Sequence, residues 1–180
     1  MDGKGLVGML LGVALLGGCS MTEQNYLEQP DQYGLYVARI NIYMDNTLQI
    51  RNDQTGEVIA VQIHLYGRPG AYGYLETSLK PGRYHIYDYR PFKNVIIPML
   101  TDTGYFDVQA GCFNYGGDIV FATPEGGRIN YSDSVDLTAL SDLPGPLAKQ
   151  AESGRDICSA PLGKPNQRFS FDSVKATLSR

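Results

Sequence analysis

Residues 57–66 read EVIAVQIHLY, and this stretch decides the fold class. One face of the extended chain would carry four aliphatic side chains, those of Ile59, Val61, Ile63 and Leu65. The opposite face includes Gln62 and His64. Alternation with a period of two residues indicates a half-buried β-strand. We therefore predict a strand whose aliphatic face points into a core and whose His64 faces solvent or a loop.

Similar short runs, rich in β-branched and aromatic residues, lie on both sides of this stretch. They cover residues 35–44, 47–52, 57–66, 73–79, 83–90, 94–99, 105–111 and 112–122. Turn-forming segments such as NDQTGE, GRPGAYG and KPG separate them. Short strands with turns at roughly 8- to 12-residue spacing are typical of antiparallel all-β folds. The sequence therefore predicts a single antiparallel β-sandwich over residues 35–180.

The C-terminal third departs from this pattern. Residues 141–154 read SDLPGPLAKQAESG and are compatible with one short helix, with Pro146 near its first turn and Gly154 as its stop. Residues 168–178 read RFSFDSVKATL. Their spacing of apolar residues predicts a last strand.

The first eighteen residues have the organisation of a secretory signal peptide. Residues 5–18, GLVGMLLGVALLGG, carry no charge and follow Lys4. A transmembrane helix needs about 20 apolar residues, which is more than this run contains. A buried helix of the mature domain is the alternative, but such a helix would need a polar face that this run lacks. We therefore predict that residues 1–18 are a cleaved leader.

Leu16, Gly17, Gly18 and Cys19 read LGGC, which resembles the lipobox of bacterial lipoproteins. The resemblance implies that the Cys19 sulfur receives a diacylglyceryl group, that the chain is cut just before it, and that the new amine is acylated. Several acyl chains together hold a protein stably at a membrane. Ser20 follows where an aspartate would imply retention at the inner membrane of a Gram-negative cell. The resemblance thus implies the outer membrane, with the domain facing the periplasm unless it is flipped to the surface.

Residues 20–34, SMTEQNYLEQPDQYG, are polar and without periodicity, so residues 19–34 are predicted to form a lipidated flexible tether.

Composition limits the partners of the protein. The formal net charge is −4, and no cluster of lysine and arginine is present. This argues against binding to nucleic acid and against charge-driven binding to anionic lipid. The expected partners are the membrane, through the acyl chains, and an envelope protein or complex.

Cys112 and Cys158 remain once Cys19 is acylated. An even number of cysteines in an exported chain predicts a disulfide between them. The two residues are 46 positions apart, and a bridge over that distance is worth roughly 4 kcal/mol in the chain-entropy model. The alternative is a reactive thiol working with His64 or His85, which no nucleophile signature supports.

A second resemblance covers residues 35–122. The segments LKPGRYHIYDYR and YFDVQAGCFNYGGDIVF are similar to those of small transthyretin-like or carboxypeptidase-regulatory-like sandwiches found in bacterial lipoproteins of uncharacterised function. The resemblance implies a β-sandwich. These domains have no shared catalytic residues, so the resemblance assigns none here.

Motifs for catalysis and for cofactors are absent from the sequence. The two histidines are not at a metal-ligand spacing, and the aspartates are scattered. No nucleophile elbow, phosphate-binding loop or dinucleotide-binding turn is found. We therefore expect a protein that is not an enzyme and has no metal or cofactor.

Tyrosine is unusually frequent, with 13 residues and no tryptophan. Five tyrosines on neighbouring runs are candidates for a binding face: Tyr72, Tyr74, Tyr84, Tyr87 and Tyr89. Such a face would contact a partner protein or stack on glycan sugars. The sequence as a whole predicts a periplasm-facing lipoprotein that acts as a structural or protein-interaction module of an envelope complex. Peptidoglycan binding is the first alternative, and an envelope hydrolase is the second.

Overall fold

The computed structural model describes residues 21–41, 47–66, 72–92, 95–98, 104–122, 128–131, 135–153 and 155–178. Within these ranges the chain is mainly β-structure, as the alternating runs predicted. The strands are β1 (Gly34–Ile40), β2 (Thr47–Asn52), β3 (Val58–Leu65), β4 (Gly73–Leu79), β5 (Gly82–Phe92), β6 (Val95–Pro98), β7 (Tyr105–Val108), β8 (Cys112–Ala122), β9 (Arg128–Tyr131), β10 (Asp156–Ser159) and β11 (Gln167–Phe169). Every run predicted between residues 35 and 122 overlaps one of these strands, and residues 42–44, 94 and 99 of those runs lie outside the described residues.

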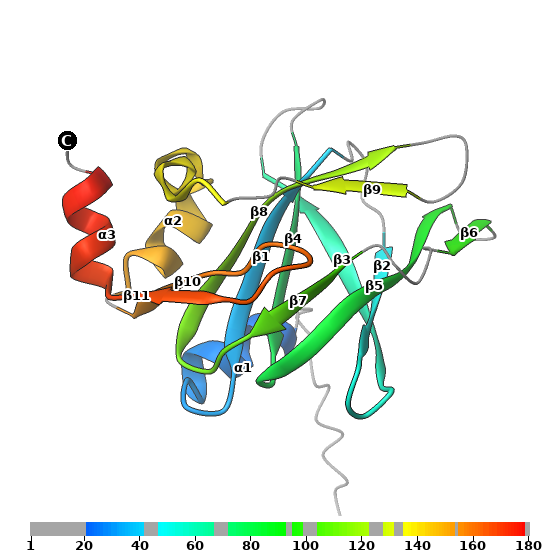
Figure 1. Ribbon diagram of the computed structural model, residues 1–180, viewed down its shortest axis with the longest axis horizontal. Helices are drawn as coiled ribbons and strands as arrows, with labels where there is room; N and C mark the ends of the chain where they lie inside the picture. The colour runs from blue at the N-terminus through cyan, green and yellow to red at the C-terminus, as the bar shows by residue number, and fades with distance from the viewer. Residues whose placement is uncertain are drawn as a thin grey trace, which may run out of the picture.

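The described strands belong to one mixed sheet that curls into a half-barrel (Figure 1). Nine of them follow the order β11-β10-β8-β1-β4-β3-β2-β5-β6, while β7 pairs with β5 and β9 pairs with β8. The pairs β1–β8 and β8–β10 are parallel. The prediction of a single antiparallel sandwich is therefore correct in its β-rich content and wrong in its architecture, because the sheet is mixed and curls into a half-barrel. A parallel pair needs a long crossover connection, and residues 41–111 supply one between β1 and β8.

Strand β1 lies in the middle of the sheet, and its two faces serve two different cores. Leu35 and Val37 point to one face, while Tyr36 and Ala38 point to the other, and all four are fully buried. Beside it, Gly117 adopts φ +72° where the register between β1 and β8 shifts. A positive φ is the conformation that glycine supplies at a β-bulge.

The first core fills the inside of the half-barrel. Its members come from strands β1 to β5, from β7 and β8, and from the segment after β10: Tyr36, Ala38, Ile40, Leu48, Ile50, Val61, Ile63, Leu75, Leu79, Tyr84, Ile86, Tyr89, Phe106, Val108, Ile119, Ala160 and Leu162. Strand β7 closes over this core, because the Phe106 ring stacks on Tyr36 with centroids 3.9 Å apart. Burial of Val61 and Ile63 confirms the inward face predicted for β3.

The second core lies on the other face of β1, β4, β8 and β10, beneath the helices. These are α1 (Met21–Glu28), the 3-10 helix η1 (Leu137–Asp142), α2 (Gly145–Ala151) and α3 (Phe171–Leu178). The core consists of Tyr26, Leu35, Val37, Tyr74, Phe113, Tyr115, Leu140, Leu143, Leu147, Ala151, Ile157 and Val174. In Figure 1, α2 and α3 lie side by side next to β10 and β11. The short helix predicted within residues 141–154 is confirmed as α2, and Gly154 lies outside the described residues.

Two segments differ from the prediction. Helix α1 occupies part of the predicted tether, because Tyr26 supplies an apolar ring that is fully buried in the second core. The predicted last strand is correct only for β11, and α3 replaces it from Phe171 onward. Phe171 and Val174 are three residues apart, which places them on one face of a helix. Ser170 precedes the helix, and its hydroxyl accepts a hydrogen bond from the Ser173 backbone N–H at 3.4 Å.

Buried tyrosines predict a loss of the fold at alkaline pH. Burial raises the pKa of Tyr115 to about 12 and raises the pKa of Tyr36 well above its ordinary value. An unfolded tyrosine ionises near pH 10, so both contributions to stability are complete below about pH 10 and decline as the pH rises towards 12. At about 1.4 kcal/mol per pKa unit, the Tyr115 contribution that is lost is roughly 3 kcal/mol. Circular dichroism and tyrosinate absorbance should therefore report one shared transition in this window.

Tyr36→Phe is the matched variant for this titration. The Tyr36 hydroxyl is buried and makes no hydrogen bond within the described residues, so its removal leaves no partner unpaired. Tyr36→Phe should unfold at a higher pH than the natural protein because the ring stays while the ionisable group is lost. Unfolding of both proteins at the same pH would show that Tyr36 does not contribute to the alkaline transition.

Candidate functional site

The predicted lipidation site, Cys19, and the predicted signal peptide, residues 1–18, lie outside the described residues. In the part of the chain that the structure describes, no helix is both long and apolar enough to cross a membrane. Attachment through Cys19 stays a prediction from the LGGC motif.

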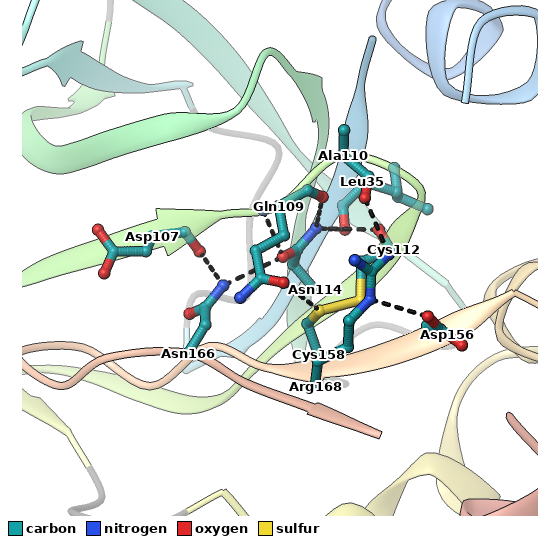
Figure 2. Close-up of a disulfide and its surroundings, with 10 residues drawn as sticks. All are labelled: Leu35, Asp107, Gln109, Ala110, Cys112, Asn114, Asp156, Cys158, Asn166 and Arg168. Carbon is teal, nitrogen blue, oxygen red and sulfur yellow. Dashed lines mark hydrogen bonds and ion pairs between the residues drawn. A yellow bond between two sulfur atoms is a disulfide. The ribbon is translucent and has the colours of Figure 1, made fainter. Parts of the chain in front are cut away.

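Cys112 of β8 and Cys158 of β10 form a disulfide with Cα atoms 5.9 Å apart (Figure 2). The predicted pairing is thus confirmed. Both cysteines are fully buried, and Cys158 lies opposite Asn114 in the parallel pair of strands. The bond ties the segment that follows η1 and α2 back onto the strand that precedes them.

Asn114 lies next to the disulfide and bonds through both ends of its amide (Figure 2). Its Oδ1 accepts hydrogen bonds from the Gln109 backbone N–H at 2.9 Å and from Asn166 Nδ2 at 3.3 Å. Its Nδ2 donates to the carbonyl oxygens of Cys112 at 2.9 Å and Gln109 at 3.1 Å. Asn166 Nδ2 also donates to the Asp107 carbonyl at 2.7 Å. A buried amide with its polar atoms paired is a structural feature, and here it joins β7, β8 and the segment after β10.

The five tyrosines predicted as a binding face are not brought together on one surface. Tyr74 belongs to the core beneath the helices, and Tyr84 and Tyr89 belong to the core inside the half-barrel. Burial raises the pKa of Tyr74 and of Tyr84. The Tyr84 hydroxyl donates to the Lys80 carbonyl at 2.9 Å, which occupies its polar end inside the fold.

Tyr72 and Tyr87 are exposed, by 46% and 44% respectively. The Tyr72 ring centroid is 4.9 Å from the guanidinium carbon of Arg39, next to β4 and β1. The Tyr87 ring centroid is 5.9 Å from the guanidinium carbon of Arg51, on β5 and β2. The two rings thus lie over different pairs of strands.

The contact of His85 with Asp53 has the appearance of a catalytic pair. The Nδ1 atom of His85 lies 2.5 Å from Asp53 Oδ1, which is the arrangement of a base with an orienting carboxylate. Within the described residues, no serine, threonine or cysteine hydrogen-bonds to this imidazole, so the pair lacks a nucleophile. His64 lies on β3, which β2 separates from the β5 strand of His85. No cluster of three or more metal-ligating side chains occurs in the described ranges.

A pocket of about 490 Å³ lies between η1, α2, α3 and β10 and is the best candidate for a binding site. Its apolar lining consists of Leu140, Ala148, Ala151, Ile157, Phe171 and Val174. We call this pocket the helical groove. Binding sites for ligands and for apolar segments of partners are typically concave and apolar, with a few polar groups at the edge.

Local sequence explains why helices surround the helical groove. The backbone N–H and hydroxyl of Thr138 donate to the Asp136 carboxylate at the start of η1, at 2.9 and 2.7 Å. These bonds lower the pKa of Asp136 and fix its role as an N-cap. Pro146 lies in the first turn of α2, where its missing N–H has no helical partner to lose.

The rim of the helical groove is polar and carries both charges. Ser141, Glu152 and Lys175 contribute to the lining and are exposed. The Lys175 Nζ is 5.8 Å from the centroid of the Phe171 ring. A rim with one acid and one base around an apolar floor suits an amphipathic partner better than a strongly charged one.

The local sequence pattern does not reveal the helical groove. Interpreted as a strand, residues 168–178 place Phe171 and Val174 on opposite faces, so no shared apolar face was visible. The spacing of three residues between them, next to the α2 segment, was the available signal. Only the packing of α3 against η1 and β10 shows that the two side chains border a cavity.

Comparisons with known proteins leave the site unassigned. No known family and no curated protein matches the chain. Among solved structures, the chain is similar to a leucine-rich repeat protein from Bacteroides thetaiotaomicron, with 13% identity and a TM-score of 0.32. The match covers 52% of this chain and 12% of that protein. A likeness this distant carries no argument about fold or function.

Proposed function

We propose that the protein is an outer-membrane lipoprotein, anchored by acyl chains on Cys19, whose β-rich domain faces the periplasm and binds an envelope protein or complex. The observation that carries the interaction role is the helical groove, an apolar concavity of about 490 Å³ between helices. Its occupant would be an apolar or amphipathic segment of the partner, since the floor is apolar and the rim is mixed in charge.

The compartment has two independent lines of support. The LGGC motif indicates acylation of Cys19. The buried disulfide between Cys112 and Cys158 is the kind of bond that forms and persists outside the cytosol. Both agree with export, and the motif also indicates attachment to a membrane.

Glycan binding is the second candidate, and one patch favours it. Tyr87 is exposed, and its ring centroid lies 5.9 Å from the guanidinium carbon of Arg51 and 6.5 Å from the ring centroid of His85. An exposed aromatic ring can stack on a sugar, and polar side chains near it can bond the sugar's hydroxyls. Sedimentation with purified peptidoglycan that is lost in Tyr87→Ser would favour this candidate over the groove.

Crosslinking in intact cells tests the proposed interaction through Ala148→Glu. Ala148 is half-buried on α2 and lines the groove, so the substitution places a carboxylate where the partner's apolar segment would lie. Leaving a charge unpaired in such an interface costs more than about 1.4 kcal/mol, which corresponds to a tenfold loss of affinity. We expect at least tenfold less of the crosslinked partner than the natural protein recovers.

Two further variants serve as controls for this experiment. Ala176→Glu makes the same chemical change on an exposed part of α3 outside the groove, and it should leave the crosslinked partner unchanged. Cys19→Ser should incorporate no labelled palmitate, because the Cys19 thiol is the expected acceptor of the diacylglyceryl group. Equal recovery of the partner with Ala148→Glu and Ala176→Glu would remove the groove from the proposal, and equal labelling of the natural protein and Cys19→Ser would remove the anchor.

A further inference from the structure

We propose that helix α1 holds the domain directly at the membrane surface, with the α1 side of the molecule facing the lipid headgroups. This inference rests on the proposed acylation of Cys19. A domain held in this way has one side that faces the membrane, which we call the near side, and one that faces away, which we call the far side. A domain on a long flexible tether would have neither.

Tyr26 fixes α1 to the domain. Its side chain is fully buried in the core beneath the helices, in contact with elements of the sheet and of the C-terminal third. Arg155 Nη1 donates to the Tyr26 carbonyl at 2.9 Å, and Arg155 Nη2 donates to the Leu27 carbonyl at 3.4 Å. The guanidinium carbon of Arg155 also lies 4.5 Å from the centroid of the Tyr26 ring.

These contacts stabilise the C-terminal end of α1. The last carbonyl groups of a helix have no helical partner and carry partial negative charge. Arg155 supplies both donors and a positive charge at that end. Because Arg155 comes directly before β10, the disulfide-bonded part of the chain holds α1 in place.

The length of chain between Cys19 and Tyr26 limits how far the domain can lie from the membrane. If residues 19–34 were free, the lipid and the first strand could separate by about 50 Å, at about 3.5 Å per residue. With α1 helical from Met21, Tyr26 is about 8 Å along the helix from its start, at 1.5 Å per residue. The two residues from Cys19 to Met21 add at most about 7 Å. The Cα atom of the docked Tyr26 therefore lies within about 15 Å of the Cα atom of the acylated residue.

The near side of the domain can be named from the same contacts. Tyr26 and Ala151, the last residue of α2, are buried in the same core, so the end of α2 belongs to the near side. Val120 belongs to the far side. It is 42% exposed near the end of β8, about 23 Å along that strand from Phe113, which pairs with Leu35 close to α1.

Energy transfer from single tryptophans to labelled lipids tests the orientation. The chain contains no tryptophan, so Glu152→Trp reports the near side and Val120→Trp reports the far side without background. The chain from residue 19, which contains every described residue, is coupled through Cys19 to maleimide lipids in phosphatidylcholine vesicles that carry dansyl-phosphatidylethanolamine. Cys112 and Cys158 are joined to each other, so Cys19 is the free thiol. We expect at least twofold greater transfer from Glu152→Trp than from Val120→Trp.

Release of α1 should abolish that difference. Tyr26→Ser, added to either reporter, removes the buried ring and should make the two transfers equal. Insertion of flexible glycine-serine repeats between Ser20 and Met21 leaves every described contact intact and should reduce the difference stepwise with length, even if Tyr26→Ser fails to fold. Equal transfer from both reporters without these changes would overturn the proposal.

The coupled protein separates this inference from the proposed function. Mass spectrometry of the protein from cells reports whether Cys19 is acylated, whereas the vesicle experiment supplies the lipid chemically. An unmodified Cys19 in cells would refute the lipoprotein assignment and leave the orientation measurement valid as a property of the fold. Acylation in cells together with equal transfer on vesicles would refute only the role of α1.

Discussion

Replacement of Cys112 and Cys158 by alanine is expected to lower the free energy of unfolding by about 4 kcal/mol. The disulfide closes a loop of the unfolded chain with a separation of 46 residues, and its loss restores that conformational freedom. Both side chains are fully buried, so their truncation also leaves space in the core. For a domain of this size the melting temperature should fall by roughly 10 °C or more. Urea denaturation and calorimetry measure the two quantities.

Reduction supplies the control for this prediction. The natural protein with dithiothreitol should approach the stability of the double alanine variant, and the variant itself should not respond to the reductant. Thiol counting on an unreduced Cys19→Ser variant should give no free thiol per chain. Two free thiols, or a variant as stable as the natural protein, would contradict the expected contribution of the bridge.

Gly34→Ala is expected to lower the free energy of unfolding by about 3 kcal/mol. A methyl group at this position would overlap the Gln109 carbonyl oxygen and would lie 2.5 Å from Asn114 Nδ2. The first atom belongs to the backbone and the second to the buried amide network, so neither has room to withdraw. The substitution should also disturb the hydrogen bonds between Asn114 and Gln109. Urea denaturation of the variant measures the loss.

Gly145→Ala is the matched substitution. Gly145 lies in the first turn of α2, and a methyl group there would meet no atom within 4 Å. It should leave the protein equally stable or stabilise it by up to about 1 kcal/mol, because alanine has the higher helix propensity. Similar losses from both substitutions would show that the close approach at Gly34 does not determine the stability of the fold.

The sequence predicted the strands well because the signal for a strand is local. The alternation in residues 57–66 identified β3 and its buried face, and composition alone located every other strand between residues 35 and 122. The disulfide was predictable for a different reason. The predicted export implied oxidation, and the predicted acylation of Cys19 left two cysteines to pair.

The incorrect predictions share one cause. A local sequence pattern does not encode which residues far apart in the chain pack together. Periodicity shows that a strand has a buried face, but it does not show that β8 pairs in parallel with β1 and β10. Tyr84 and Tyr89 were predicted to belong to a binding face, but the curl of the sheet buries both side chains in the core. Phe171 and Val174 fitted a strand or a helix, and packing against η1 and β10 selected the helix.

The sequence by itself determined that this chain is a β-rich domain with a disulfide, because both depend on neighbouring residues or on composition. Acylation of Cys19 stays a prediction from the LGGC motif. Only the tertiary structure decided which faces became cores, that Asn114 and Gly34 are constrained by distant backbone, and that Tyr26 fixes the start of the domain to its end. Those outcomes depend on contacts between residues up to about 130 positions apart, such as Arg155 with Tyr26, and a folded chain has to bring such residues together before their chemistry can matter.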